Sequence, residues 1–285
     1  MPLALVTAPS AMLIDIAEAR LHVRQDLREE DPRIRRAILA CTRWAEGETQ
    51  RSFIARRWKL TLDAFPGNNV AAVPYGVGYG LPGNGILLEF GPTLSVVSIN
   101  YTAMDGTFTL LPATEYQADL SGAIARITPK FGKIWPVTLP QIGAVEVVYD
   151  AGVAAPFTAD PVADTLTVPG IWKTYVVGDA VRLTNSGGAL PAPLADLTDY
   201  YVQAVVAPGV YKVAATVGGA AIDLVDAGTG TQYVGLVPSN VVSWLLLRLG
   251  SMYEHREADI AMDRGSITAL PYIDRLLDAH TSWLY

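Results

Sequence analysis

Hydrophobic positions in the first fifty residues recur at helical spacing after two capping sequences. Asp15 and Glu18 are three residues apart, as in a capping box with Asp as the cap, and a short helix is predicted to start there. Asp31 followed by Pro32 supplies an N-cap and a proline at the first helical position, which predicts a second helix running to about Arg51. The apolar positions of this second helix line one face: Ile34, Ile38, Cys41 and Ala45.

From Trp58 onward the hydrophobic period shortens to two residues. Trp58, Leu60 and Leu62 alternate with polar residues, as in a strand with one buried face. Further strands are predicted at 86–90, 94–101, 107–111, 125–128 and 144–149. Asp105-Gly106 predicts a tight hairpin turn in which both central residues have positive φ. The middle of the chain therefore predicts a small, mainly antiparallel sheet.

The composition changes after residue 153. Residues 154–237 contain three basic residues, seven aspartates and no glutamate, and they are rich in glycine, threonine, valine and alanine. Short strands are predicted at 165–168, 180–184, 200–206, 210–213, 222–225 and 233–236. Short strands at this spacing are typical of a barrel or sandwich. We expect residues 154–237 to be an autonomous inserted β-domain, with the parent fold resuming at Pro238.

The stretch from Pro238 to Glu257 predicts a helix that is apolar on nearly every side. Ser239 is its predicted N-cap. A membrane span needs about 20 apolar residues, and the apolar run from Val241 to Leu249 is shorter and is interrupted by Ser243 and Arg248. We therefore expect protein to cover the helix, either from the same chain or from a neighbouring copy.

A last helix is predicted to begin at Leu270-Pro271, with an apolar stripe formed by Ile273, Leu276 and Leu277. With the earlier elements it predicts an α+β fold: a helical bundle from the N- and C-terminal helices with a small antiparallel β-sheet, plus an inserted all-β barrel or sandwich. The expected domains are 1–153 with the N-terminal helices and sheet, 154–237 as the insert, and 238–285 completing the first domain.

Composition and charge narrow the classes of function. The 285 residues carry a net charge of -7, which argues against wholesale coating of nucleic acid. Eleven of the 21 Lys and Arg nevertheless lie between Arg20 and Lys59, so a local basic face is expected. The single Cys41 allows no internal disulfide and no cysteine metal cluster. Residues 1–7 lack the positive region of a signal peptide, so assembly in the cytoplasm is expected.

The patterns of common enzyme sites are missing from the sequence. The glycine-rich stretch from Pro66 to Gly85 has no Gly-Lys followed by Ser or Thr, so it is interpreted as a flexible loop. No serine elbow and no HExxH pair occur, and Cys41 falls on an apolar stripe where thiols are usually inert. We expect no catalytic residue, no metal site and no cofactor.

Carbohydrate or host binding by the inserted β-domain is the alternative function from another class. The residues that could offer stacking faces to a sugar serve equally well as core: Trp172, Tyr175, Tyr200, Tyr201 and Tyr211.

The order of these features resembles a family of head-tail connector (adaptor) proteins of long-tailed bacteriophages and prophages. The likeness rests on DIAEARLHVR, IRRAILACTRWAEGETQRSFIARRWKLTLDAFP, YQADLSGAIARITPKFGKIWP with AVEVVYDAG, LLLRLGSMYEHRE and the final ALPYIDRLLD. It covers about residues 10–153 and 238–280. The insert departs from that pattern and looks like a β-module found inserted in varied phage structural proteins, so its role does not carry over.

The resemblance implies a non-enzymatic neck component of a virion or phage-like particle. Such a protein forms a ring, often of twelve copies, that joins the portal protein to the next neck or tail component, a stopper or tail terminator, around the DNA channel. Passing DNA is contacted non-specifically, and no membrane is involved. The residues expected at the portal or subunit interface are Trp244, Trp283, Leu284 and Tyr285. Those expected to face DNA or an acidic partner are Arg33, Arg35, Arg36 and Arg43.

Overall fold

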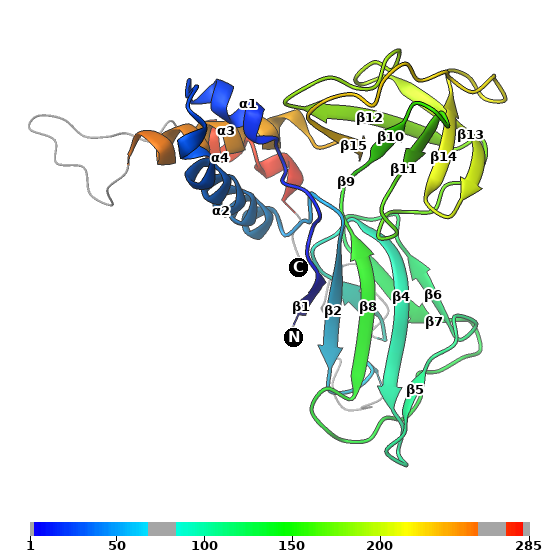
Figure 1. The fold of residues 1–285 in the computed structure, drawn as a ribbon. Coiled ribbons are helices and arrows are strands. Elements are labelled where there is room, and N and C mark those ends of the chain that lie inside the picture. The colour runs from blue at the N-terminus through cyan, green and yellow to red at the C-terminus, as the bar shows by residue number, and fades with distance from the viewer. Residues whose placement is uncertain (1–2, 68–83, 256–271, 282–285) are drawn as a thin grey trace, which may run out of the picture. The chain divides into compact units, whose positions relative to one another are not determined.

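The computed structural model describes residues 3–67, 84–255 and 272–281, and they are mostly β (Figure 1). Their strands form three sheets of five, seven and three strands. The prediction of a helical bundle with a small sheet is therefore wrong. Helices α2 (Asp31–Thr49) and α3 (Ser239–Glu254) are long, but α1 (Ile16–His22) has seven residues and α4 (Tyr272–Arg275) has four. The helices predicted from the hydrophobic spacing do form, but they are too few and too short for a helical bundle to be the main layer of the fold.

The chain divides into two compact units. The described residues of unit 1 are 3–9, 50–67 and 84–152, and those of unit 2 are 10–49, 153–255 and 272–281. The four α-helices named above therefore belong to the same unit as residues 153–237.

Unit 1 is built from two antiparallel sheets. The five-stranded sheet has the order β1 (Leu3–Thr7), β2 (Arg56–Leu62), β8 (Val145–Ala151), β4 (Thr93–Thr102), β5 (Phe108–Leu110). The three-stranded sheet has the order β3 (Ile86–Leu88), β7 (Ala125–Pro129), β6 (Tyr116–Asp119). Alternate residues of both sheets share one core, among them Leu60, Ile99, Val147, Leu88 and Ile127. The alternation read from Trp58 onward is thus the burial pattern of a two-layer β unit.

The hairpin predicted at Asp105-Gly106 forms, with a different turn. Gly106 has a φ of 84°, whereas Asp105 is not among the residues with positive φ. The Asp105 carboxylate accepts hydrogen bonds from the Thr107 backbone N–H at 2.9 Å and from its hydroxyl at 2.6 Å. These bonds from Thr107 lower the pKa of Asp105. The aspartate therefore fixes the turn through its side chain.

The seven strands of unit 2 curl into a barrel-like sheet. Their order is β10 (Thr158–Asp160), β11 (Thr165–Thr167), β14 (Val210–Ala214), β13 (Asp199–Ala207), β12 (Ala180–Ser186), β15 (Thr231–Gly235), β9 (Ala154–Pro156). The two outermost strands, β9 and β10, are separated in sequence by Phe157 alone, so the edges of the sheet must lie close together. Residues 222–225, predicted as a strand, are not one, although the Ile222 N–H donates to the Val213 carbonyl at 2.8 Å.

Helix boundaries follow the sequence closely. Asp15 caps α1, its carboxylate accepting the Ala17 N–H at 2.8 Å. The predicted stripe of α2 is completely buried: Ile34, Ile38, Cys41 and Ala45. Ser239 is not the cap of α3, because Pro238 occupies that position and its carbonyl accepts the Val241 N–H at 3.0 Å. Among the described helices, none has the length and hydropathy needed to cross a membrane.

Candidate interaction surfaces

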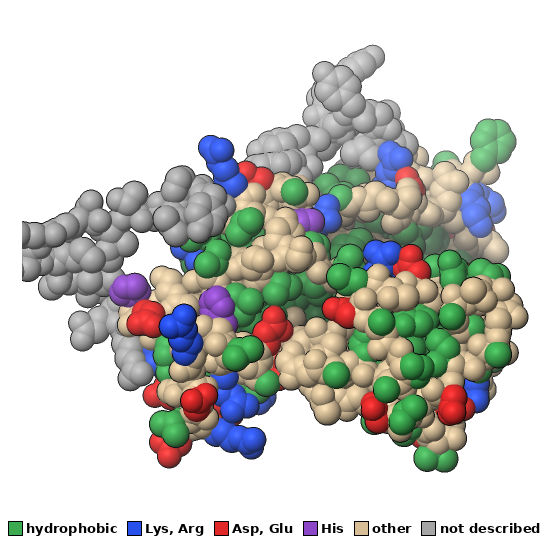
Figure 2. Space-filling view, turned by 90° about the horizontal axis from the view of Figure 1, so that it is seen from above, with side chains coloured by type: hydrophobic (Ala, Val, Ile, Leu, Met, Phe, Trp, Pro, Cys, Tyr) green, Lys and Arg blue, Asp and Glu red, His purple; other side chains and the backbone are tan. Residues whose placement is uncertain are grey.

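The predicted basic face lies on α2, but its four arginines differ in their surroundings. Arg35, Arg36 and Arg43 are exposed. Arg33 is half-buried, with its guanidinium 4.8 Å from the ring centroid of Tyr253 and donating to the Tyr253 carbonyl at 2.9 Å. In Figure 2 basic and acidic side chains are mixed over the left part of the view, and hydrophobic side chains cover much of the right part, with charged side chains among them. Three of the four arginines are thus available to a partner, and Arg33 fastens α2 to α3.

Trp244 is a packing residue of the α2–α3 contact. It is 1% exposed, and its ring meets that of Trp44 edge-on with centroids 5.5 Å apart. The Arg248 guanidinium lies 4.6 Å from the Trp44 centroid and 5.6 Å from that of Trp244, within the range of cation–π attraction. Sequence reasoning missed Trp44 and Arg248. The spacing of four between Trp244 and Arg248 was a usable signal, because it places both on one helical face.

A cleft of about 300 Å³ opens beside these two tryptophans. Its walls come from α2, α3 and the residues after α4: Trp44, Glu48, Trp244, Arg248, Leu277, Asp278 and Thr281. Glu48 accepts the Trp44 indole N–H at 3.2 Å, whereas the Nε1 of Trp244 is buried without a hydrogen-bond partner. Trp244 is covered by its own chain, so a partner would contact it through this cleft. Its role at an interface stays a prediction.

Helix α1 is joined to the barrel by a network of hydrogen bonds centred on Asp15. The Asp15 backbone N–H donates to the Ser186 hydroxyl at 2.6 Å, and its carboxylate accepts from the Thr231 hydroxyl at 2.6 Å. The Ser186 hydroxyl donates in turn to Glu18, and the Tyr233 hydroxyl donates to the Met12 carbonyl. Glu18, expected in a capping box, is therefore used to hold the barrel.

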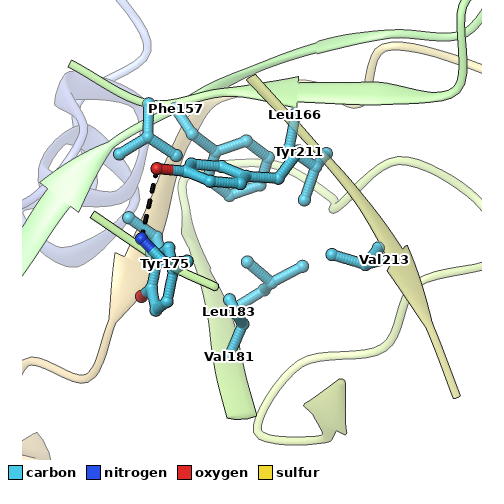
Figure 3. A pocket seen from close by; sticks show the side chains of 9 residues that line it. Phe157, Leu166, Tyr175, Val181, Leu183, Tyr211 and Val213 are labelled. Atoms are coloured by element: carbon cyan, nitrogen blue, oxygen red, sulfur yellow. Dashed lines mark hydrogen bonds between the residues drawn. The ribbon is translucent and has the colours of Figure 1, made fainter. Parts of the chain in front are cut away.

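Four of the five aromatic residues considered for sugar stacking are buried in the barrel: Trp172, Tyr175, Tyr200 and Tyr211. Figure 3 shows Tyr175 and Tyr211 facing the apolar interior, with the Tyr175 N–H donating to the Tyr211 hydroxyl at 3.3 Å. Burial raises the pKa of Tyr175 to about 12. The cavity between them measures about 10 Å³, the volume of a single water probe, and cannot hold a sugar. These four rings are core and offer no stacking face.

The residues with catalytic or metal-binding potential are scattered. In residues 3–67, 84–255 and 272–281, no three His, Cys, Asp or Glu side chains come together as a metal site. His280 is hydrogen-bonded to the Asn240 side chain at 2.8 Å, and Asn240 also donates to the Leu276 carbonyl. The histidine thus joins α3 to the C-terminal residues.

Cys41 is expected to resist alkylation while the protein is folded. Burial raises the pKa of its thiol to about 11, so on the order of one thousandth of it would be thiolate at pH 8. Treatment with iodoacetamide at pH 8, followed by mass spectrometry, should label Cys41 in urea but leave it nearly unlabelled in buffer. Equal labelling rates in the two solutions would contradict the buried position.

Several sequence predictions fall outside the described residues, among them the predicted helix end at Glu257 and the predicted start of the last helix at Leu270-Pro271. The others are the central part of the glycine-rich stretch, at 68–83, and the apolar C-terminal residues Trp283, Leu284 and Tyr285.

Comparison with known proteins finds similarity at the level of the fold. No family model and no curated protein matches the sequence. A solved chain in the virion of a native gene transfer agent (GTA) particle aligns with a TM-score of 0.54 and 17% identity, covering 99% of this chain and 96% of that one. This chain shares the fold of a GTA particle protein. A chain in the neck of an empty GTA particle, computed with C6 symmetry, aligns over the same shares with a TM-score of 0.51 and 17% identity.

The extent of the alignment bears on the β-domain. Because the match covers 99% of this chain and 96% of the GTA chain, residues 154–237 have a counterpart in the GTA protein. The β-domain, which sets the chain apart from the adaptor pattern in sequence, is therefore part of the fold that the two proteins share.

Proposed function

We propose that this protein is a non-enzymatic adaptor in the neck of a phage-like particle. In this role, copies of the chain form a ring that joins the portal to the next neck or tail component around the DNA channel. The observation that carries the proposal is the similarity of fold, over nearly the whole chain, to a chain in a GTA virion and to a chain in the neck of a GTA particle. The order of sequence features resembling head-tail adaptors supports it independently.

The surfaces of unit 2 suit such a role. Arg35, Arg36 and Arg43 present positive charge along α2, where it can attract DNA phosphates without reading sequence, or meet an acidic protein surface. The barrel carries three basic residues against seven aspartates, so it repels DNA and is the better candidate for the outside of a ring. Sugar binding by the barrel is not put forward, since its aromatic side chains are mostly core.

Deletion of the gene tests the proposal directly. Particles purified from the deletion strain should contain DNA-filled heads that lack necks and tails, as seen by negative-stain electron microscopy. Expression of the full chain from a plasmid should restore complete particles. Complete particles in the deletion strain, or empty heads with tails attached, would refute the neck role.

We also propose that the C-terminal residues, which include the expected interface residues Trp283, Leu284 and Tyr285, attach the ring to the portal, and removal of residues 281–285 tests this. We expect the shortened protein to fold, because the described hydrogen bonds that are lost are both local, from the Thr281 hydroxyl to the Leu277 carbonyl at 3.2 Å and from the Thr281 N–H to the Asp278 carbonyl at 3.3 Å. Particles made with it should package DNA but fail to retain necks or tails. The loss should be at least about tenfold, because the ring multiplies each lost contact. If these particles assemble normally, the exposed arginines of α2 become the better candidate for attachment.

A further inference from the structure

The edges of the three sheets differ in how they are protected. Natural edge strands usually carry a charge, a proline or a cover, because their free backbone groups can pair with another chain. Here β10 and β6 each end in an aspartate and β9 ends in a proline, whereas β3 has neither but its Ile86 and Leu88 side chains are buried. The two remaining edges, β1 and β5, have neither a charged residue nor a proline in their sequences LALVT and FTL.

These two unprotected edges also expose apolar side chains. On β1, Leu5 is 44% exposed and Val6 is 53% exposed. On β5, Phe108 is 61% exposed and Leu110 is 59% exposed.

The face of the sheet between the two edges is polar. Arg57 forms a bidentate ion pair with Asp150, with nitrogen–oxygen distances of 2.7 and 2.9 Å, and the Lys59 Nζ lies 3.0 Å from the Glu146 Oε1. A partner lying across this face would have to desolvate the ion pairs. A partner at either edge meets apolar side chains and a strand that pairs on one side only within the described residues. The sheet is therefore suited to contacts at its edges.

Strands β1 and β5 are the two edges of one five-stranded sheet, and they do not pair with each other within the chain. We propose that β5 of one copy pairs with β1 of the next, so that the sheet continues from subunit to subunit. A contact between two different surfaces of the same protein is the kind that closes into a ring. This inference rests on the ring proposed above, and it identifies the part of the chain that would build it.

The register of the sheet predicts the direction of this contact. Four antiparallel pairings separate β1 from β5, so the two strands run the same way within a chain. Rotation about a ring axis along the strands preserves that direction, and the new pairing is then parallel. A two-fold dimer would instead pair β1 with β1 or β5 with β5. A bulge after Leu5 limits the regular part of β1 to Leu3–Leu5.

Cysteine cross-linking distinguishes these arrangements. Ala4 on β1 pairs with Lys59, and Leu110 on β5 pairs with Asn100, which in turn pairs with Glu146. Lys59 and Glu146 form an ion pair on one face of the sheet, so Ala4 and Leu110 lie on that same face. The double variant Ala4→Cys/Leu110→Cys, treated with a short flexible bismaleimide, should give a ladder of dimers, trimers and larger species. Each single variant should give no ladder, and the buried Cys41 should stay unreacted. Dimers from a single variant would indicate a two-fold contact and overturn the proposal.

Two controls complete the experiment. The pair Ala4→Cys/Thr158→Cys places the second thiol on β10, an exposed edge that ends in an aspartate, and should give at least about tenfold less cross-linked product. Changing Phe108→Thr in the double-cysteine variant should reduce its ladder by a similar factor, while Val225→Thr, at an exposed valine of unit 2, should not. Equal ladders from both cysteine pairs would overturn the edge contact.

Light scattering of the unmodified chain at the same concentration gives the mass of any ring that it forms. This mass shows whether a failed cross-link refutes the edge contact alone or the proposed function as well. Rings of unmodified chain without a ladder from the Ala4/Leu110 pair would refute the edge contact and leave the adaptor role standing. A chain that forms neither rings nor ladders and is absent from purified particle necks would refute both.

Discussion

Replacing Trp244 with alanine is expected to lower the free energy of unfolding of unit 2 by about 3–5 kcal/mol. Trp244 is 1% exposed and lies between α2 and α3, so truncation leaves a cavity that the two helices cannot fill without moving. It also takes away one of the two rings beneath the Arg248 guanidinium. Urea unfolding followed by circular dichroism at 222 nm reports on this unit, because it contains α2 and α3.

Trp44→Ala is the matched control for this substitution. The same ring type is removed from the same contact, but Trp44 is 45% exposed, so the expected loss is about 1–2 kcal/mol. The unfolding transition of unit 1, the unit that contains Trp58 and Trp135, should be unaffected by either change. If the two variants lose equal stability, the burial of Trp244 does not dominate the α2–α3 contact.

Local patterns in the sequence were sufficient to predict an element where its burial depends on residues close to it in the chain. The buried stripe of α2 was predicted, and so was a strand starting at Trp58, which forms at Arg56–Leu62. Both follow because one face of an element is buried whatever covers it. The exposure of Arg35, Arg36 and Arg43 follows from the same periodicity.

Features that depend on distant partners could not be predicted. Strand β1 forms because it pairs with β2 more than fifty residues later, and its burial pattern carries no alternation. Strand β6 was missed because its residues are polar and half-exposed, while apolar residues 222–225 were predicted as a strand that does not form. The cation–π contact of Arg33 required Tyr253, which is 220 residues away.

The fold class was wrong for a related reason. Periodicity identifies elements one at a time, but the class depends on which element forms the main layer. Unit 1 places eight strands in two sheets around one core, and the sequence pattern was interpreted as one small sheet accompanying helices. The length of α4, four residues, could not be read from a stripe of Ile273, Leu276 and Leu277 that continues into a 3₁₀ turn.

Replacing residues 154–237 with a short Gly-Ser linker is the second substitution with a large expected effect. Sequence analysis predicted that the rest of the chain would stay folded, and we keep that expectation for unit 1, whose described core contains no residue of the segment. Helix α1 should lose its order, because the deletion removes Ser186, Thr231 and Tyr233. These residues supply four hydrogen bonds to the segment 12–18, each worth about 0.5–1.5 kcal/mol.

Hydrogen exchange measured by mass spectrometry should therefore show fast exchange in residues 16–22 of the deletion variant and unchanged protection in β2, β4 and β8. Gly187→Ala tests the same contact in the full chain. Its Cβ would lie 2.7 Å from the Asp15 Cβ, at a residue whose φ is +74°, so the substitution both strains the turn and displaces α1. Gly218→Ala is the matched control, since its φ is +73° but its Cβ would meet nothing within 4 Å. Faster exchange of α1 in Gly187→Ala than in Gly218→Ala is the expected result. Equal protection of α1 in the deletion variant and the full chain would show instead that the β-domain is an independent insertion.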